Sequence, residues 1–396
     1  MTDKLLNQHT TILLDNMYKT IVVSTREFYH ELTRQLYADT PRKTFFGEGE
    51  LIPTSLLTKF KWREFVSNDS DELSNMGGVI ETLGKFLRSS EPPFLLNILE
   101  HLNLSALFWS FDTDMDPDVL PLTLSSALLV NEVLTSLDVS GNKIGPTGAT
   151  AIAEALRVNG VLTQMNLEEN KIGKEGAAAI AEALKVNGVL KTLDLSFNDI
   201  GPEGGVVIAE ALHGNAVLKT LILHSNHIGD EGAKAIGGAL AVNAVLTDLN
   251  LRLNNIGDEG AAALGKALEV NGVLTDLNLL NNKIGPEGAA AIAEALKVNG
   301  VLTNLNLGFN KIGPEGGVAV GEALRVNRVM KTLNIRHNQL CGIDIMGQGT
   351  YSDVGITALA EALKVNGVLT TLYLGANDLG DEWTGAIRDA VSGRVG

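Results

Sequence analysis

The segment that decides the fold is residues 161–188, VLTQMNLEENKIGKEGAAAIAEALKVNG. Closely similar segments begin at Val133, Val161, Val189, Val217, Val245, Val273, Val301, Val329 and Val368. The first seven steps between these starts are all 28 residues long. A fixed period of this length indicates an array of stacked repeats, in which each unit buries its apolar face against its neighbours.

The first half of each unit predicts a short strand followed by a turn. In residues 189–216, Leu190, Leu193 and Leu195 alternate with polar residues. An asparagine then follows in all nine regular units: Asn142, Asn170, Asn198, Asn226, Asn254, Asn282, Asn310, Asn338 and Asn377. Backbone groups lose their sheet partners where a strand bends, and an amide side chain supplies both a donor and an acceptor. We therefore expect a buried, structural asparagine ladder.

The second half of each unit predicts a helix. It opens with Gly-Pro-Glu-Gly or Gly-Asp-Glu-Gly, and we expect Asp230 and Asp258 to cap the helices that they begin. In residues 289–297 the spacing of Ile292 and Leu296 places both side chains on one helix face. Val-Asn-Gly ends the helix, and we expect its Asn or Gly to adopt the left-handed cap conformation.

These motifs carry a family resemblance. L-x-x-L-x-L-x-x-N, Ile-Gly-x-Glu-Gly and Ala-x-x-Ile-Ala-Glu-Ala-Leu closely resemble the ribonuclease-inhibitor-type leucine-rich repeat. The resemblance is strong over residues 133–396 and weak back to residue 98. It implies an α/β solenoid, a curved horseshoe with parallel strands on its concave face and helices on its convex face.

Residues 1–97 lack the repeat and predict a mainly helical N-terminal region or cap. Nine of the eleven Phe lie before residue 112, whereas the repeats are built from Leu, Ile and Ala. Apolar residues at helical spacing predict a long amphipathic helix over residues 1–38, and shorter helices are expected around 55–66 and 77–88. The long helix either packs on its own domain or docks into a partner's groove.

Residues 98–132 are a longer, degenerate repeat that is expected to cap the array. They contain an acidic run at residues 112–118 in which Asp alternates with other residues, as in a calcium loop. Pro117 replaces the turn glycine of such a loop, and Thr123 replaces its bidentate Glu. We therefore interpret the run as an acidic surface loop and predict no metal site.

Composition excludes several classes of partner. The net charge of −16 argues against a nucleic-acid binder and against an anionic membrane surface, and it favours a basic partner. Cys341 is the single cysteine, which fits a reducing compartment, and no apolar run reaches the roughly 18 residues of a membrane span. We expect a cytoplasmic protein.

No catalytic pattern is found in the sequence. It lacks a phosphate-binding Gly-x-x-x-x-Gly-Lys-[Ser/Thr] loop, a His-Glu-x-x-His motif, a Gly-x-Ser-x-Gly elbow and any Cys/His cluster. The glycines recur at repeat positions, where they serve turns and packing. We predict a protein that is not an enzyme and that uses no cofactor.

Differences between repeats point to candidate partner-binding residues. The two positions before the ladder asparagine vary most, and the candidates near them are Glu168, Glu169, Phe197, His224, Arg252, Leu253, Leu280, Phe309, Arg336, His337 and Tyr373. Phe197, Leu253, Leu280 and Phe309 are expected to be apolar groups at the rim of the strand face, where aromatic residues and Arg favour binding. The alternative is drift on a tolerant surface.

The eighth repeat carries an insertion at residues 341–352. Insertions in repeat arrays form loops on one side, often a binding side. Ile343, Ile345, Met346 and Tyr351 make this loop apolar, so it either contacts a partner or folds back on the array. Cys341 is expected to be inert in this apolar setting.

Three functions fit these observations. The first is a non-catalytic scaffold for a protein partner, with fold-level analogy pointing to a cytoskeletal or ciliary assembly that uses the N-terminal region or the thinly capped C-terminal end. The second resembles the Ran-type GTPase-activating family, with Arg157, Arg252 and Arg336 to test, although the family's acidic C-terminal tail is missing. The third is an innate-sensor-like or inhibitor-like role.

Overall fold

The computed structural model describes residues 101–103, 119–129, 131–343, 346–379, 383 and 387. They belong to two compact units, Met1–Ile172 with Glu182–Leu193 and Gly173–Ala181 with Asp194–Gly396. The helices predicted for residues 1–38, 55–66 and 77–88, and the acidic run at 112–118, lie outside the described residues.

The first unit contains parallel strands in chain order. Strand β1 (His101–Asn103) pairs with β2 (Ser136–Asp138), which pairs with β3 (Gln164–Asn166). Helix α6 (Val119–Leu128) packs against α7 (Gly145–Leu156). Helix α8 (Gly173–Leu184) and strand β4 (Thr192–Asp194) are each divided between the two units.

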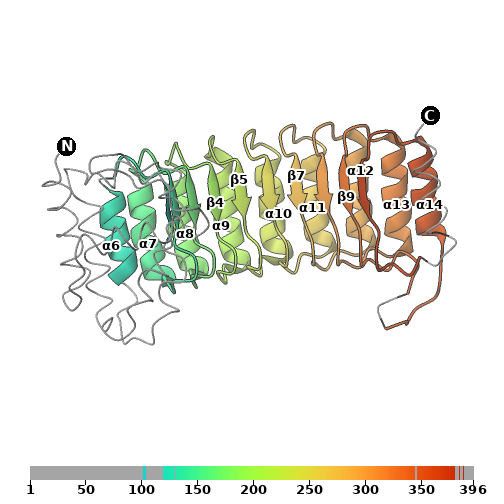
Figure 1. The fold of residues 1–396 in the computed structure, drawn as a ribbon, viewed down its shortest axis with the longest axis horizontal. Helices are drawn as coiled ribbons and strands as arrows, with labels where there is room; N and C mark the ends of the chain where they lie inside the picture. The colour runs from blue at the N-terminus through green and yellow to red at the C-terminus, as the bar shows by residue number, and fades with distance from the viewer. Residues whose placement is uncertain are drawn as a thin grey trace, which may run out of the picture. The chain divides into compact units, whose positions relative to one another are not determined.

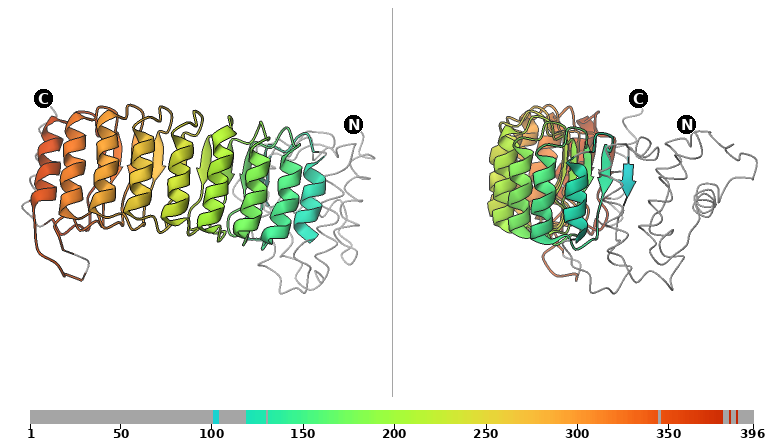
Figure 2. Two further views of the ribbon diagram at one scale, coloured as in Figure 1. Left: turned by 180° about the vertical axis from the view of Figure 1, so that it is seen from behind. Right: turned by 90° about the vertical axis from the view of Figure 1, so that its left-hand side faces the viewer.

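The second unit repeats the same arrangement. Its parallel strands, paired in chain order, are β5 (Thr220–Ile222), β6 (Asp248–Asn250), β7 (Asp276–Asn278), β8 (Asn304–Asn306), β9 (Thr332–Asn334) and β10 (Thr371–Tyr373). Each of these strands is preceded in the chain by one helix, in order α9 (Gly201–Gly214), α10 (Gly229–Leu240), α11 (Asp258–Leu268), α12 (Pro286–Val298), α13 (Gly313–Val326) and α14 (Val354–Val365). Within this unit the helices form one layer and the strands another (Figures 1 and 2).

The core lies between these two layers. The repeat that contains β5 is typical, with Leu221, Leu223 and Ile228 fully buried beneath Ile236 and Ala239 of α10. The small alanine lets the helix lie close to its neighbours, since no long side chain separates them. The predicted α/β leucine-rich-repeat solenoid of parallel strands and helices is confirmed.

The asparagine ladder is also confirmed. The backbone N–H of Asn226 donates to Oδ1 of Asn254 at 3.0 Å, and its Nδ2 donates to the carbonyl of Leu195 at 2.8 Å. Oδ1 of Asn254 also accepts from the N–H of Ile228 at 3.3 Å. One buried amide thus satisfies backbone groups that the turn leaves without partners.

A second asparagine row corrects the prediction for the helix ends. Asn215 has φ −78° and ψ 122°, so it is extended rather than left-handed. Its counterpart Asn243 is buried, donates from Nδ2 to the carbonyl of Leu212 at 2.7 Å, and accepts from the N–H of Leu246 at 2.8 Å. The amide joins the end of one helix to the strand of the next repeat, and this role replaces the expected left-handed cap.

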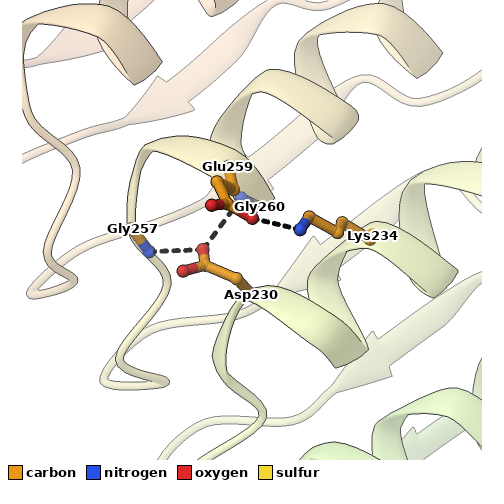
Figure 3. A network of polar contacts seen from close by, with 5 residues as sticks. All are labelled: Asp230, Lys234, Gly257, Glu259 and Gly260. Atoms are coloured by element: carbon orange, nitrogen blue, oxygen red, sulfur yellow. Dashed lines mark hydrogen bonds and ion pairs between the residues drawn. The ribbon is translucent and has the colours of Figure 1, made fainter.

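The aspartates of the Gly-Asp-Glu-Gly motifs also differ from expectation. Oδ1 of Asp230 accepts from the backbone N–H groups of Gly257 and Gly260, both at 2.8 Å, so it caps α11 of the next repeat rather than its own helix (Figure 3). Asp258 repeats these contacts with α12. Lys234 and Glu259 form an ion pair beside this cap (Figure 3). The first-turn N–H groups of α11 therefore depend on a carboxylate 27 to 30 residues earlier.

Candidate functional site

The most variable positions of the second unit, some exposed and some buried, follow one another from repeat to repeat along a continuous edge, which we call the strand-end row. The row comprises the two residues before each ladder asparagine: Ser196, Phe197, His224, Ser225, Arg252, Leu253, Leu280, Asn281, Gly308, Phe309, Arg336, His337, Gly375 and Ala376. The N–H of the second residue donates to the carbonyl of the first residue in the next repeat. The Phe197–His224 and Phe309–Arg336 bonds are both 2.8 Å long. These bonds continue the sheet beyond β4 to β10, and they hold the row rigidly.

The second residue of each pair has a left-handed backbone. Phe197, Leu253 and Phe309 have φ values of +53°, +56° and +54°. Left-handed geometry costs a residue with a β-carbon about 1–2 kcal/mol. Glycine and asparagine tolerate it best, and one of these occupies the same place at Gly141 and Asn281. The bulky side chains are therefore present against the local backbone preference, which is characteristic of functional positions.

Phe309 is the centre of an exposed aromatic and cationic cluster. Its ring stacks on the His337 ring, with centroids 4.0 Å apart and planes 17° apart. The guanidinium carbon of Arg336 lies 5.1 Å from the centroid of the same ring, within the range of a cation–π contact. Phe309 remains 38% exposed and Arg336 is exposed, so the cluster presents both an apolar and a charged surface.

A second cluster surrounds Phe197, which is 46% exposed. Its ring meets the His224 ring edge-on, with centroids 4.6 Å apart. Nε2 of His224 and Nε of Arg252 are buried without a hydrogen-bond partner among the described residues. Burial lowers the pKa of His224, Arg252 lowers it further, and Asp194 opposes the shift. The histidine thus favours its neutral form.

The expected exposure of the four apolar residues is only partly correct. Phe197 and Phe309 are exposed and Leu253 is half-buried, but Leu280 is only 8% exposed. A β-carbon on Gly308 would lie 2.9 Å from Cδ1 of Leu280, so the leucine occupies the space that the glycine leaves. Leu280 belongs to the floor of the row rather than to its exposed surface.

Sequence reasoning missed the residues that position the row. Oδ1 of Asn250 accepts from the N–H of Arg252 at 3.0 Å, and Oδ1 of Asn334 accepts from the N–H of Arg336 at 3.1 Å. Oδ1 of Asp194 likewise accepts from the N–H of Ser196 at 2.8 Å. The signal was an Asp or Asn at the last strand position of most repeats, which forms a turn with the backbone two residues on. Tyr373 takes this position in β10 and is exposed.

The corresponding residues of the first unit have a different character. Glu168 is half-buried and Glu169 is exposed, with a left-handed φ of +56°. Their carboxylates contrast with the cationic and aromatic residues of the strand-end row. Arg157 lies at the end of α7 and so belongs to a helix end rather than a strand end.

The insertion of the eighth repeat begins and ends beside Cys341. The N–H of Ser352 donates to the Cys341 carbonyl at 3.0 Å, and Ile343 forms an antiparallel bridge with Gly349. Met346, 77% exposed, and Tyr351 are accessible on this loop, whereas Ile343 is half-buried. Ile345 lies outside the described residues. Cys341 is buried, and burial raises the pKa of its thiol, with Asp378 and Asp353 contributing further.

The helix ends carry a second exposed apolar row that sequence reasoning did not single out. In the second unit it comprises Val242, Val270, Val298, Val326 and Val365. These valines are nearly invariant between repeats, so they offer the same surface at each step. Such a row lacks the variation that distinguishes one position of the strand-end row from another.

The described residues contain no group of three or more His, Cys, Asp or Glu side chains that could hold a metal ion. In the same part of the chain, none of the helices combines the length and apolar character needed to cross a membrane. The strand-end row itself presents aromatic rings, guanidinium groups and imidazoles on a hydrogen-bonded backbone.

Three comparisons place this arrangement among known proteins. A family model described as "Leucine Rich repeat" matches residues 130–153, 158–181, 186–209, 214–237, 242–265, 270–293 and 298–321. A search of curated proteins finds no significant match.

Solved structures with a similar fold were also found. One is leiomodin-1 actin-binding site 2, with 20% identity, a TM-score of 0.32, and coverage of 48% of this chain and 88% of that chain. Another is the tropomodulin C-terminal domain from Caenorhabditis elegans, with 13% identity, a TM-score of 0.32 and coverage of 47% and 90%. The leucine-rich repeat-containing protein LegL7 from Legionella pneumophila has 18% identity, a TM-score of 0.41 and coverage of 75% and 90%.

The family assignment rests on the repeat itself. Each matched segment joins the end of one helix to the strand, turn and helix that follow. The buried leucines and the asparagine ladder of these segments form the core described above. Residues 130–321 are built from leucine-rich repeats, and their strand–turn–helix units are similar to those of the ribonuclease-inhibitor type.

Proposed function

We propose that this protein is a non-catalytic scaffold that binds a protein partner through the strand-end row of its second unit. The observation that carries the proposal is the exposure of Phe197 and Phe309 on left-handed backbone. The backbone at these two positions does not require a bulky side chain, because glycine adopts the same conformation without strain. Binding a partner supplies a reason for the rings to be there.

The composition of the row supports the same proposal. Partner-binding hot spots are enriched in aromatic residues and Arg, and they act best when they are held rigidly before binding. Phe309 and Arg336 meet both conditions, since they pack on each other and their backbone groups are hydrogen-bonded. The exposed Met346 and Tyr351 of the inserted loop provide a further apolar contact for the same partner.

Membership of a cytoskeletal or ciliary assembly is the narrower form of this proposal. It rests on analogy between folds, and the chemistry of the row does not depend on it. A GTPase-activating role draws no support from the geometry, because Arg336 packs over an aromatic ring and Arg157 lies at a helix end. We therefore retain protein binding as the function to test.

The decisive experiment replaces Phe197 and Phe309 together by glycine. The Phe197→Gly/Phe309→Gly variant removes both rings and relieves the left-handed strain, so we expect it to stay folded. Affinity capture from native extract, followed by mass spectrometry, identifies the partners of the unmodified protein. We expect the variant to recover those partners about tenfold less efficiently or worse.

A matched control removes the same kind of surface elsewhere. Val270→Ala with Val298→Ala shortens two exposed apolar side chains at the helix ends, and we expect capture to be unchanged. Circular dichroism melting of both double variants establishes that they are folded. If the Phe197→Gly/Phe309→Gly variant captures the same partners as efficiently as the unmodified protein, the proposal is wrong.

A further inference from the structure

The strand-end row is cationic in an acidic protein. None of its fourteen residues is Asp or Glu, whereas Arg252 and Arg336 each carry a positive charge, in a chain of net charge −16. The side chains therefore form a local surface whose charge is opposite to that of the whole molecule. Net charge by itself favours a basic partner, so the row and the whole chain predict different ligands.

The two arginines of the row are not neutralised within the described part of the protein. The ion pairs seen there involve Lys185, Lys234, Lys297 and Lys364, and neither Arg252 nor Arg336 takes part in one. Nε of Arg252 and Nε2 of the adjacent His224 are both buried without a hydrogen-bond partner in this part of the protein. An arginine that forms no ion pair within its own protein can pair with a carboxylate from a ligand through its remaining guanidinium N–H groups.

The space between the two arginines suits an extended chain. Arg252 and Arg336 occupy the same row position three repeats apart, with Leu280 and Gly308 between them. Leu280 is buried and Gly308 has no side chain, so these residues form a low floor. Neighbouring strands are about 4.8 Å apart, which separates the two arginines by about 14 Å, the length of about four extended residues.

We propose that the row binds an extended acidic segment of a partner protein, with two carboxylates about four residues apart on Arg252 and Arg336. An apolar side chain of the same segment packs against the exposed edge of Phe309. This inference rests on the proposed function and specifies the partner's chemistry. The charge of the whole chain opposes it weakly, because salt screens charges beyond about 8 Å under physiological conditions.

The test is selection of peptides on the full chain from a phage-displayed library of random twelve-residue sequences. We expect the selected peptides to be enriched in Asp and Glu, with pairs of acidic residues three to five positions apart, around the proposed value of about four. Fluorescence polarisation with labelled synthetic copies then measures the affinity of each selected peptide for the protein and its variants.

The variants are Arg252→Gln and Arg336→Gln, with Arg325→Gln as the matched control. All three remove one positive charge, but Arg325 is exposed at the end of α13 and outside the row. We expect each row variant to lose about tenfold or more in affinity and the control to lose almost none. Arg252→Lys keeps the charge but loses the forked geometry, and we expect it to bind less tightly than the unmodified protein.

Several outcomes overturn the inference. They are selection of basic or uncharged peptides, selection of acidic peptides that bind all the arginine variants equally, and failure to select any peptide. Uncharged or basic peptides that lose affinity on Phe197→Gly/Phe309→Gly would leave the proposed function standing while removing the acidic partner. Peptides insensitive to both sets of variants would remove the row as a binding surface altogether.

Discussion

The ladder asparagines and the strand-end row are adjacent in the sequence, yet they follow opposite rules. Asn254 is identical to its counterparts in the other regular repeats, buried and hydrogen-bonded. The position of Leu253 before it is instead Gly, Glu, Phe, Ser, Asn, His or Ala in the other regular repeats. The ladder residue must satisfy backbone groups that the turn leaves unpaired, so the fold dictates its identity. The row residue must only tolerate a left-handed backbone, so its identity is free to serve another purpose.

The largest effect is expected from Asn254→Ala, because the ladder has a structural role. The change leaves the carbonyl of Leu223 and the N–H groups of Asn226 and Ile228 without the partner that they now share. With several buried polar groups unsatisfied, we expect the free energy of unfolding to fall by about 3–5 kcal/mol. Urea unfolding followed by circular dichroism measures this loss.

The neighbouring residue supplies the control. Asn255 is exposed and has a left-handed φ of +59°, so Asn255→Gly should change the free energy of unfolding by less than about 0.5 kcal/mol. Equal losses for Asn254→Ala and Asn255→Gly would mean that the distinction between dictated and free positions is wrong.

A smaller effect separates backbone strain from side-chain contacts in the row. Phe309→Gly and Phe309→Ala both remove the ring that stacks on His337, but only glycine adopts φ +54° without strain. We therefore expect the glycine variant to be more stable than the alanine variant by about 1 kcal/mol. The ranking is read from paired urea unfolding curves, and a more stable alanine variant would show that the strain is absent.

The smallest effect concerns pH. The pKa of His224 in the folded protein is lowered from its ordinary value of 6.5, mainly by burial and then by Arg252, against the influence of Asp194. The folded state therefore binds this proton less readily than the unfolded state does. Stability from this group is fully present above pH 6.5 and is lost as pH falls through the lowered folded pKa.

An NMR titration of the imidazole signals measures this shift directly. We expect His224 to titrate at lower pH than a histidine in an unstructured peptide, and Arg252→Gln to move its pKa upwards. Relative to His224→Gln, the unmodified protein should lose stability as pH falls from 6.5 toward the folded pKa, and below it the two stability curves should run parallel. A His224 signal that titrates above 6.5 would show that the row does not exclude water from this ring.

Much of the fold follows from the local sequence pattern, because every regular repeat has the same spacing of apolar residues and asparagine. The alternation of Leu190, Leu193 and Leu195 predicts the strand, and the asparagine after it predicts the ladder. Both features depend on one repeat and its nearest copy, so the sequence of a single unit contains the information needed. The candidate row was also found by comparing repeats, since positions that the fold does not dictate are those that vary.

The errors have a common physical origin in contacts between repeats. Asp230 was expected to cap its own helix, but its carboxylate reaches the backbone of Gly257 and Gly260 in the next one. Leu280 was expected at the surface, but the missing side chain of Gly308 makes room for it to be buried. Neither outcome is visible within one repeat, because each depends on a neighbour about one period away.

The sequence by itself determined the repeat, its strand and helix, the buried leucines and the asparagine ladder, because periodic apolar spacing and unpaired backbone groups admit few solutions. Only the tertiary structure decided which variable residues form a surface. It places Phe309 on left-handed backbone, with its ring stacked on the His337 ring and within 5.1 Å of the Arg336 guanidinium carbon. Among the described residues, it also leaves Nε of Arg252 buried without a hydrogen-bond partner. Residues that differ between repeats form one surface because stacking brings each repeat into hydrogen-bonding contact with the next.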